Sequence, residues 1–199
     1  MNHRVLIATR NRKKLVELQR IVGATGVELL TQDDVPDYPE PVESGATFAE
    51  NALIKAREGA ARSGLPTVAD DSGLCVDALY GAPGVFSARW AGRHGDDLAN
   101  LQLLLAQVKD VPDHRRGAAF VCAAALVAPG PGERVEQGRL AGTLLRAPRG
   151  TGGFGYDPIL LPTGYTRSCA ELTPAEKDLI SHRGKAFRAL ADGLTGLSA

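Results

Sequence analysis

The sequence has little cysteine, no excess of either charge and no long hydrophobic run. Its three cysteines are widely spaced and form no Cys-x-x-Cys pair, so neither a disulfide framework nor a zinc motif is indicated. Lys plus Arg number 23, as do Asp plus Glu, which leaves no overall basic field for nucleic acid. The apolar run near the N-terminus is too short for a signal segment or a membrane span. We expect a soluble, cytoplasmic protein that binds neither nucleic acid nor a membrane.

Several common catalytic motifs are also missing. The four histidines form no His-x-x-x-His or mixed Cys/His set, which argues against catalytic zinc. There is no Walker A sequence and no Gly-x-Ser-x-Gly segment around a serine nucleophile. The segment Gly150–Pro158 matches Gly-x-Gly-x-x-Gly, but an apolar run follows it where a dinucleotide site requires a helix. We instead interpret it as a flexible loop whose Phe154 and Tyr156 stack on a flat ligand.

The sequence does contain an alternation of strand and helix patterns. The predicted strands cover residues 4–9, 27–30, 67–70, 118–129 and 134–142, the last two joined by a turn at 130–133, and a further strand follows Pro158. The predicted helices cover residues 13–22 (ended by Gly23 and Gly26), 47–64, 96–108 (capped by Asp96 or Asp97), 173–180 and 181–194. Residues 32–45 carry three prolines and are predicted to contain no helix. With no repeat or linker, we predict one α/β domain over residues 1–199, with a mixed central sheet flanked by helices.

A basic segment, Thr9–Lys14, lies between the first predicted strand and the first predicted helix. The free backbone N–H groups and partial positive charge of a helix N-terminus suit a phosphate group. Asn11 and Lys14 would add a donor and a full charge. The alternative is a solvated basic turn, which the segment taken alone favours.

Two adjacent aspartates, Asp70 and Asp71, stand where the strand predicted at residues 67–70 ends. Like charges side by side are costly unless positive charge lies near them. The pair is compatible with a solvated turn, a helix cap or a Mg²⁺ site, and taken alone it favours the turn or cap. Among the carboxylates before the second helix, Glu50 fits a helix cap, whereas Glu43 is freer to point at a ligand.

Five segments together carry a resemblance to a known family. They read IATRNRKK, ESGATFAENALIKA, ADDSGLCVDALYGAPGVFSARWAG, GTGGFGYDPI and ELTPAEKDLISHRGKA, and they span nearly the whole chain. In this order they closely resemble the inosine triphosphate pyrophosphatase family, also called dITP/XTP pyrophosphatases, which remove non-standard purine nucleotides. The resemblance implies Mg²⁺-dependent hydrolysis of a purine nucleoside triphosphate to the monophosphate and pyrophosphate. It also implies a homodimer and a two-lobed fold with an active-site cleft between the lobes.

The resemblance assigns roles to individual residues. Asp71 matches the catalytic carboxylate and, together with Glu43 and Asp70, the metal site. Lys55 matches an active-site lysine, and Ser72 matches a substrate contact. The phosphate-binding segment comprises Thr9, Arg10, Asn11, Arg12, Lys13 and Lys14. The nucleoside-binding set comprises Phe154, Gly155, Tyr156, Asp157, Lys177, His182 and Arg183.

The same residues bear on the choice of purine base and on two alternative functions, a phosphomonoesterase and a non-catalytic nucleotide-binding protein. From the donors of His182 and Arg183 we expect selection of a 6-keto purine over adenine, whose 6-amino group is itself a donor. A phosphomonoesterase with an aspartyl nucleophile would release orthophosphate, but its Asp-x-Asp signature is absent at Asp71. A non-catalytic nucleotide-binding protein would need neither the carboxylates nor Mg²⁺. The product formed from ITP distinguishes the three functions: a pyrophosphatase releases pyrophosphate, a phosphomonoesterase releases orthophosphate, and a non-catalytic protein releases neither.

Overall fold

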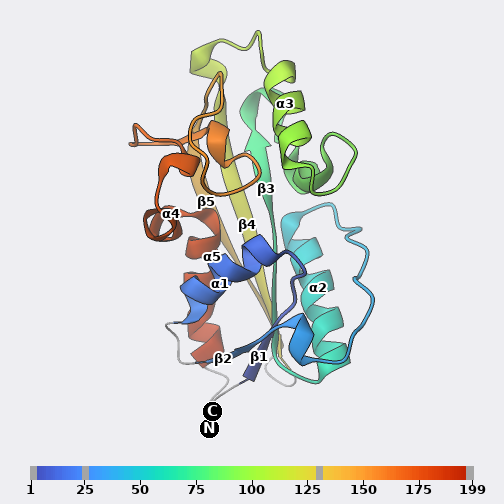
Figure 1. The fold of residues 1–199 in the computed structure, drawn as a ribbon. Helices are drawn as coiled ribbons and strands as arrows, with labels where there is room; N and C mark the ends of the chain where they lie inside the picture. Colours follow the sequence, from blue (N-terminus) through green and yellow to red (C-terminus); the bar gives the residue numbers. More distant parts are fainter. Residues whose placement is uncertain (1–3, 24–26, 129–131, 196–199) are drawn as a thin grey trace. The chain divides into compact units, whose positions relative to one another are not determined.

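The computed structural model describes residues 4–23, 27–128 and 132–195 (Figure 1). The helices are α1 (Arg12–Val22), α2 (Phe48–Ser63), α3 (Asp97–Gln107), α4 (Pro174–Ile180) and α5 (His182–Thr195). The strands are β1 (Arg4–Ile7), β2 (Glu28–Leu30), β3 (Thr67–Val76), β4 (Gly117–Ala128), β5 (Gly132–Leu144) and β6 (Leu160–Pro162). Short 3₁₀ helices are η2 (Gln32–Asp34), η3 (Asp77–Leu79), η4 (Gly84–Arg89), η5 (Asp113–Arg115), η6 (Asp157–Ile159) and η7 (Cys169–Glu171). Of the helices in these ranges, none combines the length and apolar character needed to span a membrane.

The six strands form one sheet in the order β2-β1-β3-β4-β5-β6. Strand β1 pairs in parallel with both β2 and β3, which places Val5 opposite Leu29 and Leu6 opposite Thr67. Strands β5 and β6 pair antiparallel. Parallel and antiparallel pairs in one sheet confirm the predicted mixed sheet and the α/β class.

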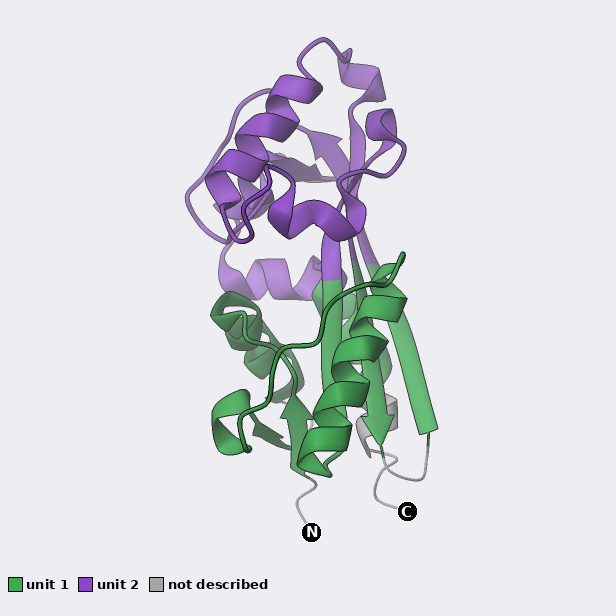
Figure 2. Ribbon diagram, turned by 90° about the vertical axis from the view of Figure 1, so that its right-hand side faces the viewer, with its two compact units in different colours: residues 1–71, 122–138, 183–199 green, residues 72–121, 139–182 purple. Residues whose placement is uncertain are grey.

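The chain divides into two compact units (Figure 2). Unit 1 comprises residues 1–71, 122–138 and 183–199, and unit 2 comprises residues 72–121 and 139–182. Strands β3, β4 and β5 contribute residues to both units. The single domain over residues 1–199 and the cleft between two lobes stay predictions.

In unit 1, helices cover both faces of the strands (Figure 1). Helices α1 and α5 pack on one face, where Leu18 and Phe187 join a buried cluster with Val68. Helix α2 packs on the other face through small side chains, with Ala52 in a cluster that includes Ala69. Val68 and Ala69 belong to different clusters because successive side chains of a strand point to opposite faces.

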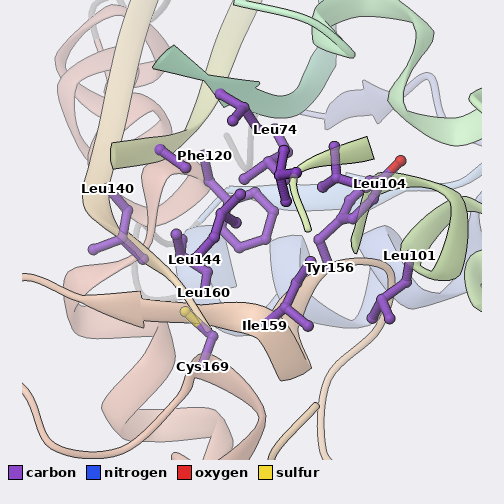
Figure 3. Packing of buried hydrophobic residues seen from close by; sticks show 13 residues of the cluster. Leu74, Leu101, Leu104, Phe120, Leu140, Leu144, Tyr156, Ile159, Leu160 and Cys169 are labelled. Carbon is purple, nitrogen blue, oxygen red and sulfur yellow. The ribbon is translucent and has the colours of Figure 1, made fainter. Parts of the chain in front are cut away.

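Unit 2 has a hydrophobic core of its own (Figure 3). Leu104 of α3, Leu74 of β3, Phe120 of β4 and Leu160 of β6 all lie in it. Fully burying an aliphatic or aromatic side chain of this size contributes about 1.5–3 kcal/mol of stability. This core is the support on which the glycine-rich loop described below is built.

Helices α2, α3 and α4 begin at the residues that the capping signals predict. Thr47 Oγ1 accepts a hydrogen bond from the backbone N–H of Glu50 at the start of α2, and the helix ends at Gly64 with φ 70°. Asp96, not Asp97, caps α3. The capping box predicted for α4 is also present. These local signals are reliable because each satisfies backbone groups that the helix itself leaves open.

The prediction that residues 32–45 contain no helix is wrong, since Gln32–Asp34 forms a 3₁₀ turn. The backbone N–H and the hydroxyl of Thr31 both donate to Asp34 Oδ2 at 2.8 Å, which stabilises this turn. The prolines of the segment all follow the turn, so they do not interrupt it. Gly26 lies outside the described residues, as does part of the turn predicted at 130–133.

Candidate active site

Strand β3 runs through the aspartate pair and does not end there. The turn predicted at this point is therefore wrong. Gly73, which signalled a turn, serves instead for close packing, because a Cβ there would lie 2.4 Å from the Gly84 carbonyl oxygen. Side chains alternate along a strand, so Asp70 points to the face covered by α1 and α5, and Asp71 points to the face covered by α2.

On the α2 face, Asp71 lies among three polar side chains. Asn51 Nδ2 donates to Asp71 Oδ2 at 3.0 Å, while Asn51 Oδ1 accepts the backbone N–H of Gly45 at 2.8 Å. Lys55 Nζ lies 3.9 Å from Asp71 Oδ1 and 2.5 Å from Glu43 Oε1. The structure thus shows that Lys55 faces the strand and that two carboxylates converge on its ammonium group.

The charges around Asp71 leave it with the character of a base. Burial raises the pKa of Asp71 above its ordinary value, and the attraction of Lys55 and Lys14 offsets only part of this rise. Burial lowers the pKa of Lys55, but the carboxylates of Asp71, Asp70 and Glu43 outweigh it and raise the pKa overall. A carboxylate with a raised pKa accepts a proton more readily, which is the property that a general base needs.

On the opposite face, Asp70 is held by two cations and a thiol. Lys14 Nζ lies 3.1 Å from Asp70 Oδ2, Arg183 Nε donates to the same oxygen at 3.2 Å, and Cys122 Sγ donates at 3.8 Å. Burial of Asp70, which is 1% exposed, raises its pKa, but Lys14, Arg183 and Lys55 outweigh burial. The pKa therefore lies well below the usual range. Asp70 is thus an anchor for Lys14 and Arg183 and a poor proton acceptor at neutral pH.

The predicted phosphate-binding segment forms the start of α1. Asn11 is the N-cap, and its Oδ1 accepts the backbone N–H groups of Lys13 at 3.0 Å and Lys14 at 3.2 Å. Thr9 Oγ1 in turn accepts the backbone N–H of Asn11 at 3.2 Å. The positive end of α1 and the Lys14 ammonium therefore belong to the same turn, which suits an anionic ligand.

Arg10 of the same segment lies beside a small hollow in unit 1. Its Nη2 donates to the backbone carbonyl of Tyr38 and lies 3.2 Å from Asp37 Oδ1. The hollow is lined by Ala8, Thr9, Arg10, Gln32, Tyr38, Glu40, Pro41 and Lys55. The hollow is therefore bordered by the basic segment, by the loop before α2 and by Lys55. Arg12 and Lys13 are exposed on the first turn of α1.

Two carboxylates of unit 1, Glu43 and Asp71, are candidate ligands for Mg²⁺. Within the described ranges, no group of three or more His, Cys, Asp or Glu side chains is gathered closely enough to hold a metal ion. Mg²⁺ needs few protein ligands, however, because it is bound through one or two carboxylates plus water and substrate phosphates. Glu43 and Asp71, which converge on Lys55, fit this donor set. Asp70 does not join them, because its carboxylate lies on the other face of β3.

In unit 2, the glycine-rich loop folds around a buried aspartate. Asp157 Oδ2 accepts the backbone N–H of Phe154 at 2.8 Å and a hydrogen bond from Lys177 Nζ at 2.6 Å. Lys177 Nζ also lies 5.0 Å from the centre of the Phe154 ring, a cation–π distance. Gly153 has φ 69°, and a Cβ there would lie 2.0 Å from Asp157 Oδ2. Strand β6 follows the loop after a 3₁₀ turn, so the rejection of a dinucleotide motif is confirmed.

Two other predicted nucleoside contacts lie in buried surroundings. Tyr156 lies within the core of unit 2 (Figure 3) and is 5% exposed. Its hydroxyl donates to the Ser87 carbonyl at 3.0 Å. This corrects the prediction that the Tyr156 ring stacks on a ligand, because its apolar surface is already used in the core. The imidazole of His182 stacks on the Phe120 ring, with centroids 5.0 Å apart and planes at 22°.

The predicted residues thus form three groups. The first two, in unit 1, are Asp71, Glu43 and Lys55 on one face of β3, and Asp70, Lys14 and Arg183 on the other. The third, in unit 2, comprises Phe154, Asp157 and Lys177. Ser72 and Gly155, also in unit 2, are partly exposed and lie outside these groups. Sequence analysis missed Asn51, Glu17, Cys122 and Phe120. For Asn51 a signal exists, because it stands four residues before Lys55 and so shares its face of α2.

Known proteins that resemble this chain identify its family. Residues 5–193 match the Ham1 family. A dITP/XTP pyrophosphatase of Streptomyces coelicolor is 63% identical over 189 residues, 94% of each chain, and one of Nocardia farcinica is 61% identical over 198 residues, 98% of this chain and 96% of the relative. A HAM1 protein of Coxiella burnetii has a TM-score of 0.86 at 41% identity, covering 98% of this chain and 99% of the other. A nucleoside-triphosphatase / dITP/XTP pyrophosphatase of Mycobacterium abscessus has a TM-score of 0.77 at 61% identity, covering 94% and 98%. The chain belongs to the Ham1 family, and the resemblance noted in its sequence is confirmed.

Proposed function

We propose that this protein hydrolyses the non-standard purine nucleoside triphosphates ITP, dITP and XTP to the monophosphate and pyrophosphate. The observation that carries the proposal is the environment of Asp71, a buried carboxylate with a raised pKa that Asn51 orients beside Lys55. Relatives that share 63% and 61% of their residues with this chain are named dITP/XTP pyrophosphatases, which supports the same reaction. Such an activity removes these nucleotides from the cellular pool.

In the proposed reaction, Asp71 accepts a proton from the attacking water. The hydrogen bond from Asn51 fixes the carboxylate, so the base does not have to reorient during the reaction. Release of pyrophosphate requires attack at the α-phosphorus, with the water in line with the leaving pyrophosphate. Lys14, Lys55 and the N-terminus of α1 supply positive charge for the phosphate oxygens.

We propose Mg²⁺ as the cofactor, held by Glu43 and Asp71 with phosphate oxygens and water. The support is the convergence of these two carboxylates on one ammonium group. When bound, Mg²⁺ neutralises phosphate charge and polarises the phosphorus–oxygen bonds. Calorimetry of Mg²⁺ binding in the presence of a substrate analogue checks the assignment. Glu43→Gln should weaken binding, whereas Glu58→Gln, at a carboxylate paired with Arg62 on α2, should not.

We assign recognition of the base to the group formed by Phe154, Asp157 and Lys177 in unit 2. The partly exposed Phe154 ring offers a stacking surface, and Lys177 and Asp157 fix the loop that carries it. Selection of a 6-keto purine by His182 and Arg183 stays a prediction.

The protein is further proposed to be a cytoplasmic homodimer, on the strength of the family resemblance, and sedimentation equilibrium should give twice the mass of the chain.

The proposed substrate class is tested by comparing kcat/KM for different nucleotides, each measured separately. We expect kcat/KM for ITP, dITP and XTP to exceed that for ATP by at least tenfold, because a donor-lined site that rejects the 6-amino group leaves buried partners unsatisfied, at about 1–3 kcal/mol each. Initial rates are measured from the release of pyrophosphate with each nucleotide. Equal kcat/KM for ITP and ATP would refute selection of the 6-keto purine, even if pyrophosphate is the product.

A further inference from the structure

Glu17 is a buried carboxylate outside every group described so far. It lies on α1, is 7% exposed, and its Oε2 accepts a hydrogen bond from Arg183 Nη1. Burial of a charge is unfavourable unless the charge is paired, so the pairing with Arg183 accounts for the presence of Glu17 in this place. Arg183 itself is 1% exposed.

Glu17 is connected to the start of α1 through two charged groups. Arg183, the partner of Glu17, also donates from Nε to Asp70 Oδ2 at 3.2 Å, and Lys14 Nζ lies 3.1 Å from that same oxygen. Lys14 and Glu17 are three residues apart on α1 and so lie on the same side of the helix. Helix α1 therefore holds both ends of a network of alternating charge, Glu17–Arg183–Asp70–Lys14.

We propose that Glu17 is a positioning residue for the reaction, because it fixes Arg183 and thereby holds Asp70 and Lys14 in place at the start of α1. This inference rests on the proposed function. The charge of Glu17 balances that of Arg183, so Asp70 is shared between Arg183 and Lys14. Without the Glu17 charge, Arg183 draws Asp70 more strongly, and the anchor of Lys14 shifts. Small displacements of a group that contacts phosphate have large effects on rate.

The test is steady-state hydrolysis of ITP by Glu17→Gln and Glu17→Asp, at a temperature where circular dichroism shows both variants folded. We expect Glu17→Gln to lower kcat about 10- to 100-fold, with less than a threefold change in KM. Glu17→Asp keeps the charge and should recover at least a third of the wild-type kcat. Glu58→Gln, which removes a partly exposed carboxylate paired with Arg62 on α2, is the matched control and should be active.

A merely structural role would lower the melting temperature of Glu17→Gln but leave kcat of the folded variant within twofold of wild type, which would overturn the proposal. If Glu17→Gln does not fold, the double variant Glu17→Met/Arg183→Met, which removes both buried charges together, is compared with Arg183→Met alone. If Glu17 acts through Arg183, both variants lose kcat to the same extent, within twofold. A kcat near wild type in both, or a further loss of more than threefold in the double variant, overturns the proposal. Absence of pyrophosphate release by the wild type would instead refute the proposed function itself.

Discussion

Asn51 and Asp71 are joined by a hydrogen bond of 3.0 Å between α2 and β3. The amide of Asn51 is held at its other end, where Oδ1 accepts the backbone N–H of Gly45. This arrangement decides which end of the amide faces the carboxylate, so Asp71 meets a donor. A carboxylate oriented in this way is fixed before any ligand binds, so we expect replacement of Asp71 to lower kcat.

Replacement of Asp71 by Asn should abolish most of the activity. The variant keeps the shape of the side chain but loses its charge and basicity, and the loss of a general base typically lowers kcat about 10²–10⁴-fold. The measurement is steady-state kinetics with ITP, accompanied by circular dichroism to show that the fold survives. Asp113→Asn is the control, because it removes an exposed carboxylate paired with Arg146 at the surface. Near-normal turnover by folded Asp71→Asn would rule out the assigned base.

Replacement of Phe154 by Ala should weaken substrates with different bases to the same extent. Stacking on an aromatic ring contributes about 1–3 kcal/mol per base and does not distinguish one purine from another. We expect kcat/KM for ITP and ATP to fall by similar factors, and the ratio between them to stay within threefold. Tyr165→Ala, at a partly exposed ring outside this group, serves as the control. A large change in the ratio would mean that Phe154 selects the base.

Gly153 and Gly155 both have positive φ, 69° and 59°, but only Gly153 lies against Asp157. Alanine at either position costs about 1–2 kcal/mol because of the left-handed backbone. At Gly153 the new Cβ also displaces the Asp157 carboxylate from the Phe154 N–H, which adds about 1–3 kcal/mol. Urea unfolding should therefore show a larger loss for Gly153→Ala than for Gly155→Ala. Equal losses would show that the loop accommodates the methyl group without moving Asp157.

The stability contributed by Glu176 should depend on pH. The hydrogen bond from Arg167, with those from Thr173, lowers the pKa of Glu176 from 4.5 to about 2. Because the folded pKa is the lower one, this stability is present above about pH 4.5 and is lost as the pH falls toward 2. The difference in melting temperature between wild type and Glu176→Gln should accordingly be largest above pH 5 and shrink below pH 4. A difference that stays constant from pH 6 to pH 2.5 would contradict this account.

Much of the fold follows from local sequence signals. Capping boxes, glycines and hydrophobic periodicity act over a few residues, so they predict helices α2, α3 and α4 nearly to the residue. The turn at Gln32–Asp34 departs from the prediction because the three prolines, on which the prediction rests, all follow the turn, which a Thr31–Asp34 capping box stabilises. The strand through Asp70 and Asp71 was cut short because a Ser-Gly pair is typical of a turn, whereas Gly73 here permits close packing.

The site was predicted in part. The order of the sequence motifs identifies the charged residues of the site. It does not show which of them form ion pairs, because these pairs join segments that are far apart in the sequence. Glu17 and Arg183 are 166 positions apart, and no local pattern relates them. Tyr156 was predicted as a ligand contact because an aromatic residue in a glycine-rich loop is equally compatible with stacking and with a core position. Only the packing of unit 2 decides between the two (Figure 3).

The identity of the phosphorus product tests the central claim most directly. Wild-type protein is incubated with ITP, with Mg²⁺ and separately with EDTA, and ³¹P NMR follows the products. We expect the monophosphate and pyrophosphate in equal amounts with Mg²⁺, and little turnover with EDTA. Orthophosphate as the primary product would place the protein among other phosphohydrolases, and no turnover of ITP, dITP or XTP would contradict the account altogether.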